Sequence, residues 1–277
     1  MRPPGQGAPP NALAVIAKEP AAGLAKIRLV PGFGEEGAAR VAAAMLADTL
    51  AAVRAVGADP WLCFTPEEAR GRLGRLAPGF GLLVQRGGDL GDRLAACLTD
   101  LLAAGADRVA IVGADTPHVP AASYRRAFAM LDEVDVVLGP ALDGGYYLVA
   151  ARAARPELFV GVPMGTEVVL AETLARAARG GLAVGLLPPL RDLDRVEDLA
   201  TALAAGELDG APATRAVATE LLAGVARSPG VSVSPTGLGR SCSPDVELGV
   251  GSLGAALDQA QQDPRGDVER AGGPGEQ

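Results

Sequence analysis

The sequence predicts an α/β fold: a three-layer, doubly wound, mostly parallel sheet with helices on both faces. Short continuous apolar runs, such as residues 13–17, are typical of strands buried on both faces of a parallel sheet. Longer segments with apolar residues at helical spacing, such as 35–56, alternate with these runs along the chain. Strands that alternate with helices of ten or more residues indicate crossover units, whose connections are expected to be right-handed.

Four strands and four helices are expected up to residue 131. Apolar runs place the strands at residues 13–17, 61–64, 82–85 and 108–112. Helical spacing places the helices at residues 35–56, 66–76, 90–104 and 121–131. Gly57 and Gly105 follow two of these helices, and glycine is a common residue just beyond a helix end.

Three further strands and three further helices are expected after residue 131. The strands are predicted at residues 135–138, 146–150 and 183–187. The helices are predicted at residues 166–179, 196–205 and 213–226, and Gly180 and Gly181 end the first of them.

The chain is expected to hold one folded domain between two disordered ends. Its 277 residues, 49% of them hydrophobic, are enough to bury one large core. Residues 1–11 are rich in proline and glycine, and residues 228–277 are rich in Gly, Ser, Pro, Asp and Gln. Such composition buries too little apolar surface to order a segment, so the predicted domain spans residues 12–227.

Charge and cysteine content restrict the partners and the compartment. The formal net charge is 25 − 33 = −8, so non-specific attraction to nucleic acid or to an anionic membrane is not expected. Three scattered cysteines and the single His118 do not form a zinc motif, and they fit a reducing compartment. Neither a secretory signal nor an uncharged apolar run of about 18 residues is recognised, so we expect a cytoplasmic protein.

The first candidate site is the loop that follows the first expected strand. The two lysines of the chain, Lys18 and Lys26, lie within nine residues of each other, and Gly23 and Arg28 belong to the same loop. Lysine is a flexible point charge suited to phosphate oxygens, and a glycine lets backbone amides approach phosphates. We therefore predict that Lys18, Gly23, Lys26 and Arg28 bind nucleotide phosphates. The alternative is an ordinary loop with a solvated basic face.

Two aspartates near strand ends are candidate metal ligands. Asp115 follows the strand expected at 108–112, where a carboxylate can hold Mg²⁺ or Mn²⁺ bridging nucleotide phosphates. Asp115 is also suited to a turn or a helix cap. Asp194 could reach the same metal, with Asp192 or Glu197 as cap of the following helix.

Two further segments are candidates for ligand binding. Residues 143–147, Asp-Gly-Gly-Tyr-Tyr, could form a plain hairpin turn, or the glycines could let a substrate lie against the backbone with Asp143 directed toward it. Asp89 is a natural helix cap and Arg93 lies one turn further on, so this helix start either lies beside the nucleotide or is simply a capped helix.

Together these motifs resemble one family. The order K-x-P-x-x-G-x-x-K-x-R-L, G-D-L-G-x-R, G-x-D-x-P, G-P-x-x-D-G-G-Y-Y-L and D-x-D-x-x-x-D-L is similar to the DUF2064 group. That group comprises GT-A-fold, nucleotide-diphospho-sugar-transferase-like proteins, among them arsenosugar-type glycosyltransferases and the rSAM/selenodomain-associated transferases. It is related to 2-phospholactate guanylyltransferases and to molybdenum-cofactor nucleotidyltransferases. The resemblance covers roughly residues 13–205.

The resemblance implies a role for each matching residue. Lys18, Lys26 and Arg28 would meet the nucleotide phosphates, with Lys26 assigned a catalytic role. Asp115 would bind Mg²⁺ or Mn²⁺, and Asp194 would be a second ligand. The acceptor or sugar side would consist of Asp143, Gly144, Gly145 and Tyr146, with Asp143 as the base, and Asp89 and Arg93 would lie on the nucleotide side.

Four positions depart from the family pattern. Ile27 stands where the family usually has threonine, which removes a hydroxyl from the phosphate loop, and His118 replaces a common aspartate. Residues 164–165, Met-Gly, replace a tryptophan-containing stretch, and residues 195–196, Arg-Val, replace Thr-Pro. These departures concern the substrate more than the fold.

Three functions remain open from the sequence. The first is metal-dependent transfer of a sugar from a nucleotide sugar to a small-molecule acceptor. The second is nucleotidyl transfer, in which a phosphorylated acceptor attacks an NTP and pyrophosphate leaves. The third is a nucleotide-binding protein without catalysis. In each case the partner is a nucleotide or nucleotide sugar, with a small acceptor in the first two.

Overall fold

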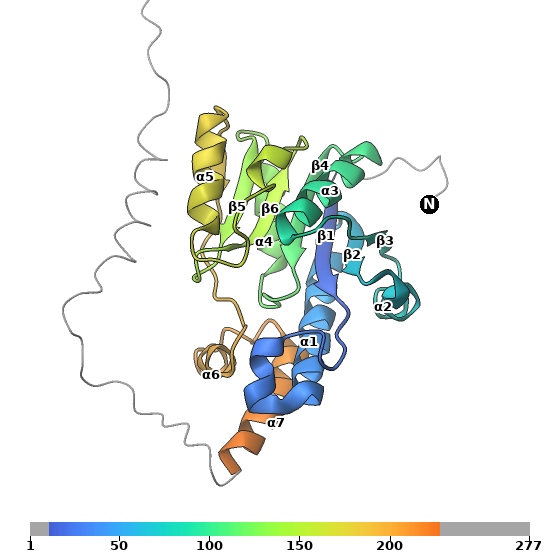
Figure 1. Ribbon diagram of the computed structural model, residues 1–277, viewed down its shortest axis with the longest axis vertical. Coiled ribbons are helices and arrows are strands. Elements are labelled where there is room, and N and C mark those ends of the chain that lie inside the picture. Colours follow the sequence, from blue (N-terminus) through green and yellow to red (C-terminus); the bar gives the residue numbers. More distant parts are fainter. Residues whose placement is uncertain (1–10, 228–277) are drawn as a thin grey trace, which may run out of the picture. The chain divides into compact units, whose positions relative to one another are not determined.

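A computed structural model describes residues 11–227 and confirms the predicted fold class (Figure 1). The strands are β1 (Asn11–Lys18), β2 (Asp59–Thr65), β3 (Gly81–Val84), β4 (Arg108–Gly113), β5 (Val136–Pro140), β6 (Tyr146–Ala151) and β7 (Val184–Leu186). The α-helices are α1 (Val30–Arg54), α2 (Arg70–Leu76), α3 (Leu90–Ala103), α4 (Ala121–Met130), α5 (Val169–Arg179), α6 (Val196–Ala204) and α7 (Pro212–Arg227). Short 3₁₀ helices are η1 (Ile27–Leu29), η2 (Glu67–Ala69) and η3 (Pro156–Leu158).

The strands form one seven-stranded sheet in the order β3-β2-β1-β4-β6-β5-β7. Neighbouring strands are parallel except at β6, which runs antiparallel to both β4 and β5. From β1 the chain builds outward to β2 and β3, and it then returns to add β4 on the other side of β1. Ligands of open α/β sheets bind where the strand order reverses in this way, so β1 and β4 mark the expected crevice.

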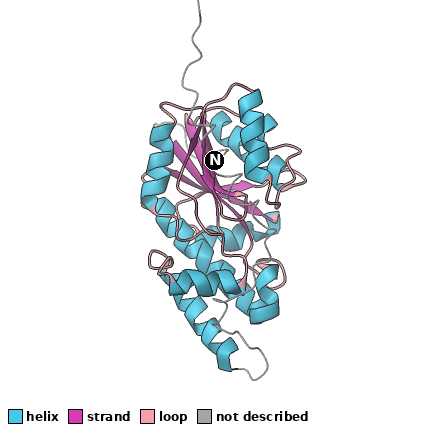
Figure 2. Ribbon diagram, turned by 90° about the vertical axis from the view of Figure 1, so that its left-hand side faces the viewer, coloured by secondary structure: helices cyan, strands magenta, loops and turns pink. Residues whose placement is uncertain are grey.

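Alternate residues of each strand enter two separate cores, one on each face of the sheet. Leu13 and Val15 of β1 pack with α1, α2 and α4, whereas Ala12 and Ala14 pack with α3 and α5. This period of two explains why the buried strands read as continuous apolar runs in the sequence. Figure 2 shows the strands between helices on either side, which is the three-layer arrangement expected.

A third core joins the start of α1 to α6 and α7. It contains Leu29 and Val41 from the N-terminal part, Leu193 and Leu199 around the start of α6, and Ala218 of α7. Figure 1 shows α6 and α7 next to α1, away from the strands. The core therefore holds the loop after β1 and the segment before α6 against each other, although these segments are far apart in sequence.

Most predicted elements agree with the structure to within a few residues, and the differences have local causes. Helix α1 begins at Val30 rather than at residue 35, with a break at Gly34, whose φ is 71°. The helix expected at 66–76 is divided into η2 and α2. Helix α5 begins at Val169 rather than at residue 166. Asn11, placed with the N-terminal segment, is the first residue of β1, and the other residues predicted to be disordered lie outside the described range.

The turn between β5 and β6 is a hairpin, because β5 and β6 pair antiparallel. The hairpin interpretation of residues 143–147 is therefore correct as structure, and any function of Asp143 is additional to it. In residues 11–227, no helix is both long and apolar enough to cross a membrane.

The buried carboxylate of Asp48 in α1 caps helix α7. Asp48 Oδ1 accepts a hydrogen bond from the Ala213 backbone N–H (3.1 Å), and Oδ2 accepts one from the Thr214 N–H (2.7 Å). We predict that Asp48→Ala lowers the free energy of unfolding by about 2 kcal/mol, because two buried N–H groups lose their partner.

Urea denaturation measures this change. Glu220→Ala is the control, since it breaks the exposed Arg40–Glu220 pair between the same two helices and is expected to change stability little. Equal effects of the two substitutions would contradict the capping role.

Candidate functional site

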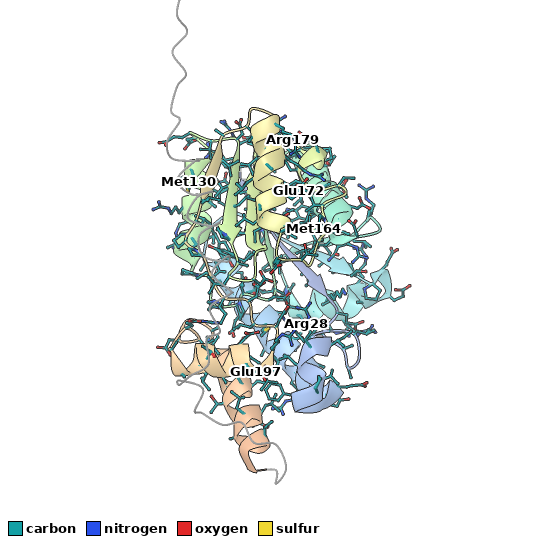
Figure 3. All side chains as sticks on the ribbon, turned by 60° about the vertical axis from the view of Figure 1, so that its left-hand side comes forward. Arg28, Met130, Met164, Glu172, Arg179 and Glu197 are labelled. Atoms are coloured by element: carbon teal, nitrogen blue, oxygen red, sulfur yellow. The ribbon has the colours of Figure 1, made fainter. Side chains whose placement is uncertain are left out.

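A cavity of about 640 Å³ opens at the carboxyl ends of β1 and β4, where the strand order reverses. Its walls come from the loop after β1, the start of α3, the end of β4, the β5–β6 turn and the segments before α5 and α6. In Figure 3, Arg28 and Met164 lie at one end of the sheet, and both line this cavity from opposite halves of the chain. Most of the sequence-predicted site residues meet here; those lining the cavity are Lys18, Lys26, Arg28, Asp89, Arg93, Asp115, Asp143, Gly145, Tyr146 and Asp194.

The loop after β1 is anchored at its start by Glu19 and at its end by Lys26. The Glu19 carboxylate accepts hydrogen bonds from the Arg72 guanidinium of α2, which lowers the pKa of Glu19. Gly23 turns the chain with a φ of +73° and does not line the cavity. The glycine thus shapes the loop, and the structure offers no contact by which it would approach a ligand directly.

Lys26 closes the loop and has an unusual backbone conformation. It is the one non-glycine residue between 11 and 227 with a positive φ (φ 51°, ψ 44°), and η1 begins directly after it. The left-handed region costs a residue with a Cβ about 1–2 kcal/mol, so other contacts must stabilise it here. The side chain of Lys26 supplies them.

The Lys26 ammonium lies between the two predicted metal ligands. Its Nζ is 2.9 Å from Asp115 Oδ1 and 2.7 Å from Asp194 Oδ1, and it donates to the Leu193 carbonyl oxygen at 3.1 Å. Three oxygen acceptors match the three hydrogens of an ammonium group. Burial alone would lower the pKa of Lys26, but Asp115 and Asp194 outweigh burial and raise it, so the group stays charged.

Asp194 is held by two cations. Its Oδ1 faces Lys26 and its Oδ2 accepts a hydrogen bond from Arg28 at 2.9 Å, which together lower the pKa of Asp194 although burial opposes this. Asp115 differs, because its side chain is 59% exposed and Lys26 is the cation it contacts. From the sequence, Asp192 or Glu197 is expected to cap α6. In the structure the cap is Asp198, whose carboxylate accepts a hydrogen bond from the Arg195 backbone N–H at 2.8 Å.

The β5–β6 turn positions Asp143. The Gly145 N–H donates to Asp143 Oδ1 at 2.9 Å, which fixes the exposed carboxylate at the mouth of the cavity. The sequence predicts that Gly144 lets a substrate lie against the backbone, but this residue does not line the cavity. A glycine is needed there because a Cβ would lie 2.1 Å from the Glu167 carbonyl oxygen. Its φ of +89° also favours glycine. Gly144 therefore lets the turn pack against the segment before α5.

The start of α3 forms the opposite wall. Asp89 caps the helix by accepting from the Asp92 N–H at 2.9 Å, as predicted, and it lines the cavity as well. Arg93, one turn further on, also lines it. The structure adds Gln85, directly after β3, whose Nε2 donates to the carbonyl oxygens of Ala17 (3.0 Å) and Cys63 (2.8 Å). Both amide hydrogens are thus engaged, so the Oε1 is the atom left for a ligand.

Asp192 is a site residue that sequence reasoning assigned to capping. It lines the cavity, and burial raises its pKa to about 7, with Asp143, Asp115 and Asp194 adding to the shift and Lys26 opposing it. The segment before α6 reaches this position because Ala141 bridges Leu190 and the Leu142 N–H donates to the Leu190 carbonyl at 2.9 Å. The alternation of Asp192 and Asp194 predicts opposite directions for the two side chains in an extended segment, whereas in the structure both line the cavity.

The residues of this chain suit a hard divalent cation by their chemistry. Two carboxylates and a carbonyl oxygen already surround one cationic centre, the Lys26 ammonium, and oxygen is the ligand that Mg²⁺ and Mn²⁺ prefer. Within residues 11–227, no three acidic, histidine or cysteine side chains are grouped so as to hold a metal ion as they stand. The Lys26 ammonium lies between Asp115 and Asp194, and the assignment of these two residues to a metal stays a prediction.

Comparison with known proteins agrees with this picture of the fold. Residues 48–166 match the model of a family described as "Uncharacterized protein conserved in bacteria (DUF2064)". The matched segment contains Asp115 and Asp143 but not the Lys26 loop or Asp194. No curated protein matches the chain in sequence.

Several solved structures are similar to this chain. A protein from Desulfovibrio desulfuricans G20, provisionally named a nucleotide-diphospho-sugar transferase, is 28% identical, with 79% of this chain and 97% of that chain covered and a TM-score of 0.74. A nucleotidyl transferase from Methanothermobacter thermautotroptrophicus is 19% identical, with 72% and 98% covered and a TM-score of 0.47. A Mycobacterium tuberculosis H37Rv protein in complex with manganese is 19% identical, with 70% and 98% covered and a TM-score of 0.45. The last two do not bear on the activity of this chain.

The raised pKa of Asp192 predicts a pH-dependent cost to stability. The folded protein holds the Asp192 proton up to about pH 7, whereas the unfolded chain releases it near the ordinary value of 3.8, so stability due to this group falls as pH rises from about 4 to 7. We expect Asp192→Asn to be more stable than the parent by about 2 kcal/mol at pH 8, with the difference shrinking towards pH 4.

Chemical denaturation at several pH values tests this expectation. Asp209→Asn is a suitable control, because Asp209 is exposed and pairs with Arg215. A stability difference between parent and Asp192→Asn that does not vary with pH would show that Asp192 is ionised in both states.

Proposed function

We propose that this chain is a glycosyltransferase that transfers a sugar from a nucleotide-sugar donor to a small acceptor without phosphate groups. The fold and the 28% identical transferase-like neighbour support a nucleotide-dependent transferase. The observation that carries the choice of reaction is the separation of charge within the cavity.

The basic side chains of the cavity and most of its carboxylates come from different parts of the chain. Among the described residues, every basic side chain that lines it precedes β4 in the chain: Lys18, Lys26, Arg28 and Arg93. From β4 onward, every charged side chain that lines it is an aspartate: Asp115, Asp143, Asp192 and Asp194. Asp89 is the acidic residue of the earlier part, and Lys26 and Arg28 pair with Asp115 and Asp194 where the two parts meet. Away from these pairs, the half next to β1 and α3 presents Lys18 and Arg93 and suits an anion, whereas the half next to β6 and α5 presents Asp143 and suits a neutral or cationic group.

The half next to β1 and α3 is proposed to bind the donor nucleotide. Lys18 is exposed at the end of β1, and Arg93 faces the same space from α3, so the two can meet a diphosphate. Gln85, which is bonded to the Ala17 carbonyl next to Lys18, lines the same cavity, and its Oε1 can accept a hydrogen bond from the base. Apolar side chains, among them Ile16 and Leu94, provide surface for the nucleoside.

The half next to β6 and α5 is proposed to bind the transferred sugar and the acceptor. Tyr146, Met164 and Val169 form an apolar wall there, and burial raises the pKa of Tyr146 to about 12, so its hydroxyl stays neutral. Asp143 is the carboxylate at the mouth of this half. In the proposed step, Asp143 takes the proton of an acceptor hydroxyl, the hydroxyl oxygen bonds to the anomeric carbon, and the nucleoside diphosphate leaves with the electrons of the broken bond.

Asp115 and Asp194 are the residues that would hold a divalent metal near the diphosphate. When bound, Mg²⁺ or Mn²⁺ would neutralise negative charge on the leaving diphosphate. Lys26 and Arg28 lie at the same place and contribute positive charge of their own.

Nucleotidyl transfer to a phosphorylated acceptor is less compatible with this charge distribution. The acceptor phosphate would lie next to Asp143, on the side of the cavity where the described lining residues from β6 and the segment before α5 include no basic side chain. Two unit charges of the same sign 5 Å apart repel by roughly 3 kcal/mol at an effective dielectric constant of 20. That repulsion disfavours an anionic acceptor and leaves a neutral one unaffected.

The proposal predicts the nucleotide class and the product. We expect a UDP- or GDP-sugar with Mn²⁺ to raise the melting temperature by several degrees and to be hydrolysed slowly to the nucleoside diphosphate, with water as acceptor. Thermal shift and chromatography of the nucleotides measure both. Pyrophosphate release from an NTP on adding a phosphorylated acceptor would instead establish nucleotidyl transfer, and no shift with any nucleotide would exclude both reactions.

The proposed base gives a second prediction. Asp143→Asn should lower the rate of donor hydrolysis at least tenfold, because the amide cannot accept the proton, while the affinity for the donor changes less than twofold. Asp209→Asn, on an exposed aspartate that does not line the cavity, should change neither quantity. Unchanged hydrolysis in Asp143→Asn would remove Asp143 from the mechanism.

A further inference from the structure

The Lys26 ammonium occupies a cation site built from three oxygens. Asp115 Oδ1, Asp194 Oδ1 and the Leu193 carbonyl oxygen lie 2.9, 2.7 and 3.1 Å from Nζ. The Lys26 side chain is 7% exposed, so the ammonium is nearly removed from water. Carboxylate and carbonyl oxygens are also the preferred ligands of Mg²⁺ and Mn²⁺. The side chain of this lysine and a divalent metal would therefore compete for the same oxygens.

Asp194 makes the competition direct. Lys26 holds one of its carboxylate oxygens and Arg28 holds the other, so a metal bound to Asp194 would have to share an oxygen with a cationic side chain, against the repulsion of the two charges, or displace it. Asp115 retains exposed surface, but its Oδ1 is also bonded to Lys26. A metal ion that used both aspartates would have to replace the ammonium between them.

A displaced Lys26 needs another anion. A buried or half-buried ammonium without a partner is costly, because it loses both its hydration and its ion pairs. The half of the cavity around Lys26 presents the basic residues Lys18, Arg28 and Arg93, and its carboxylate, Asp89, already accepts a hydrogen bond from the Asp92 backbone N–H at the start of α3. A diphosphate bound among these residues would offer several anionic oxygens, for which a lysine is well suited.

We propose that Lys26 makes metal binding depend on the nucleotide: its ammonium fills the Asp115–Asp194 site until nucleotide phosphates accept it. This inference rests on the proposed function in one respect, namely that a nucleotide diphosphate binds in the cavity. Metal and nucleotide then favour each other's binding, and linkage requires the effect to be equal in both directions. Lys26 is a positioning residue in this scheme, since it determines when the two carboxylates become available.

The binding of Mn²⁺ alone tests the competition. Mn²⁺ is titrated into the parent, Lys26→Met and Lys18→Met, and free Mn²⁺ is followed by EPR. Methionine keeps the length of the side chain and removes the charge, and Lys18→Met removes the same charge from the other, exposed lysine of the cavity. We expect Lys26→Met to bind Mn²⁺ at least tenfold more tightly than the parent, and Lys18→Met to remain within twofold of the parent.

The titration repeated with saturating UDP or GDP tests the coupling, after correction for Mn²⁺ bound by the free nucleotide. The nucleotide should tighten Mn²⁺ binding to the parent at least tenfold and to Lys26→Met less than threefold. Equal affinity of parent and Lys26→Met for Mn²⁺ alone would overturn the inference. Failure of UDP, GDP and other nucleotides to bind the parent, measured separately, would instead overturn the proposed function.

Parent protein labelled with ¹⁵N-lysine gives a test that does not depend on how a variant folds. The chain contains two lysines, so the exposed Lys18 is an internal reference for Lys26. We expect the Lys26 Nζ signal to stay unchanged with Mg²⁺ alone and to shift when Mg²⁺ and a nucleoside diphosphate are both present. A full shift with Mg²⁺ alone would contradict the dependence on nucleotide.

Discussion

The ion pairs of Lys26 with Asp115 and Asp194 are the interaction on which the site depends. They join three segments that are far apart in sequence: the loop after β1, the end of β4 and the segment before α6. The left-handed backbone of Lys26 costs free energy, and these contacts compensate for it. The third core packs Leu29 against Leu193 and Leu199. It therefore holds the loop after β1 next to the segment before α6, and this packing stabilises the same arrangement of Lys26 and Asp194. The conformation of the loop after β1, the positions of the two carboxylates and the shape of the cavity therefore depend on one another.

The sheet explains why charge is separated within the cavity. The loop after β1 and the start of α3 contribute the lysines and arginines together with Asp89, and the end of β4, the β5–β6 turn and the segment before α6 contribute aspartates, two of which pair with Lys26 and Arg28. The antiparallel strand β6 also contributes to this arrangement. Because β5 and β6 form a hairpin, the short turn that carries Asp143 lies at the edge where the parallel strands end. A net negative protein can in this way keep a local basic surface for an anionic ligand.

One aspartate of the site, Asp192, works against the stability of the protein above about pH 4. Asp192 is the clearest case, because burial and three neighbouring carboxylates raise its pKa to about 7, well above the ordinary value. Asp194 is also partly buried, but Lys26 and Arg28 outweigh that burial and lower its pKa. Two residues with one residue between them thus differ in the direction of their pKa shift, and the ion pairs of Asp194 are the main difference between them. Strain and unfavourable burial of this kind are typical of functional sites.

The sequence by itself determined the fold class, the order of the elements and most of the charged residues that line the cavity. Apolar periodicity, helix-ending glycines and charged residues at strand ends depend on local physics, and local physics is what a sequence pattern records. Only the tertiary structure showed that Lys26 lies between Asp115 and Asp194, that Asp192 faces the cavity, and that Gly144 is small because of the Glu167 backbone. The partner of a charge at residue 26 lies at residue 194, and no local pattern encodes a contact across that separation. Long-range packing of the loop, the hairpin and the third core decided it.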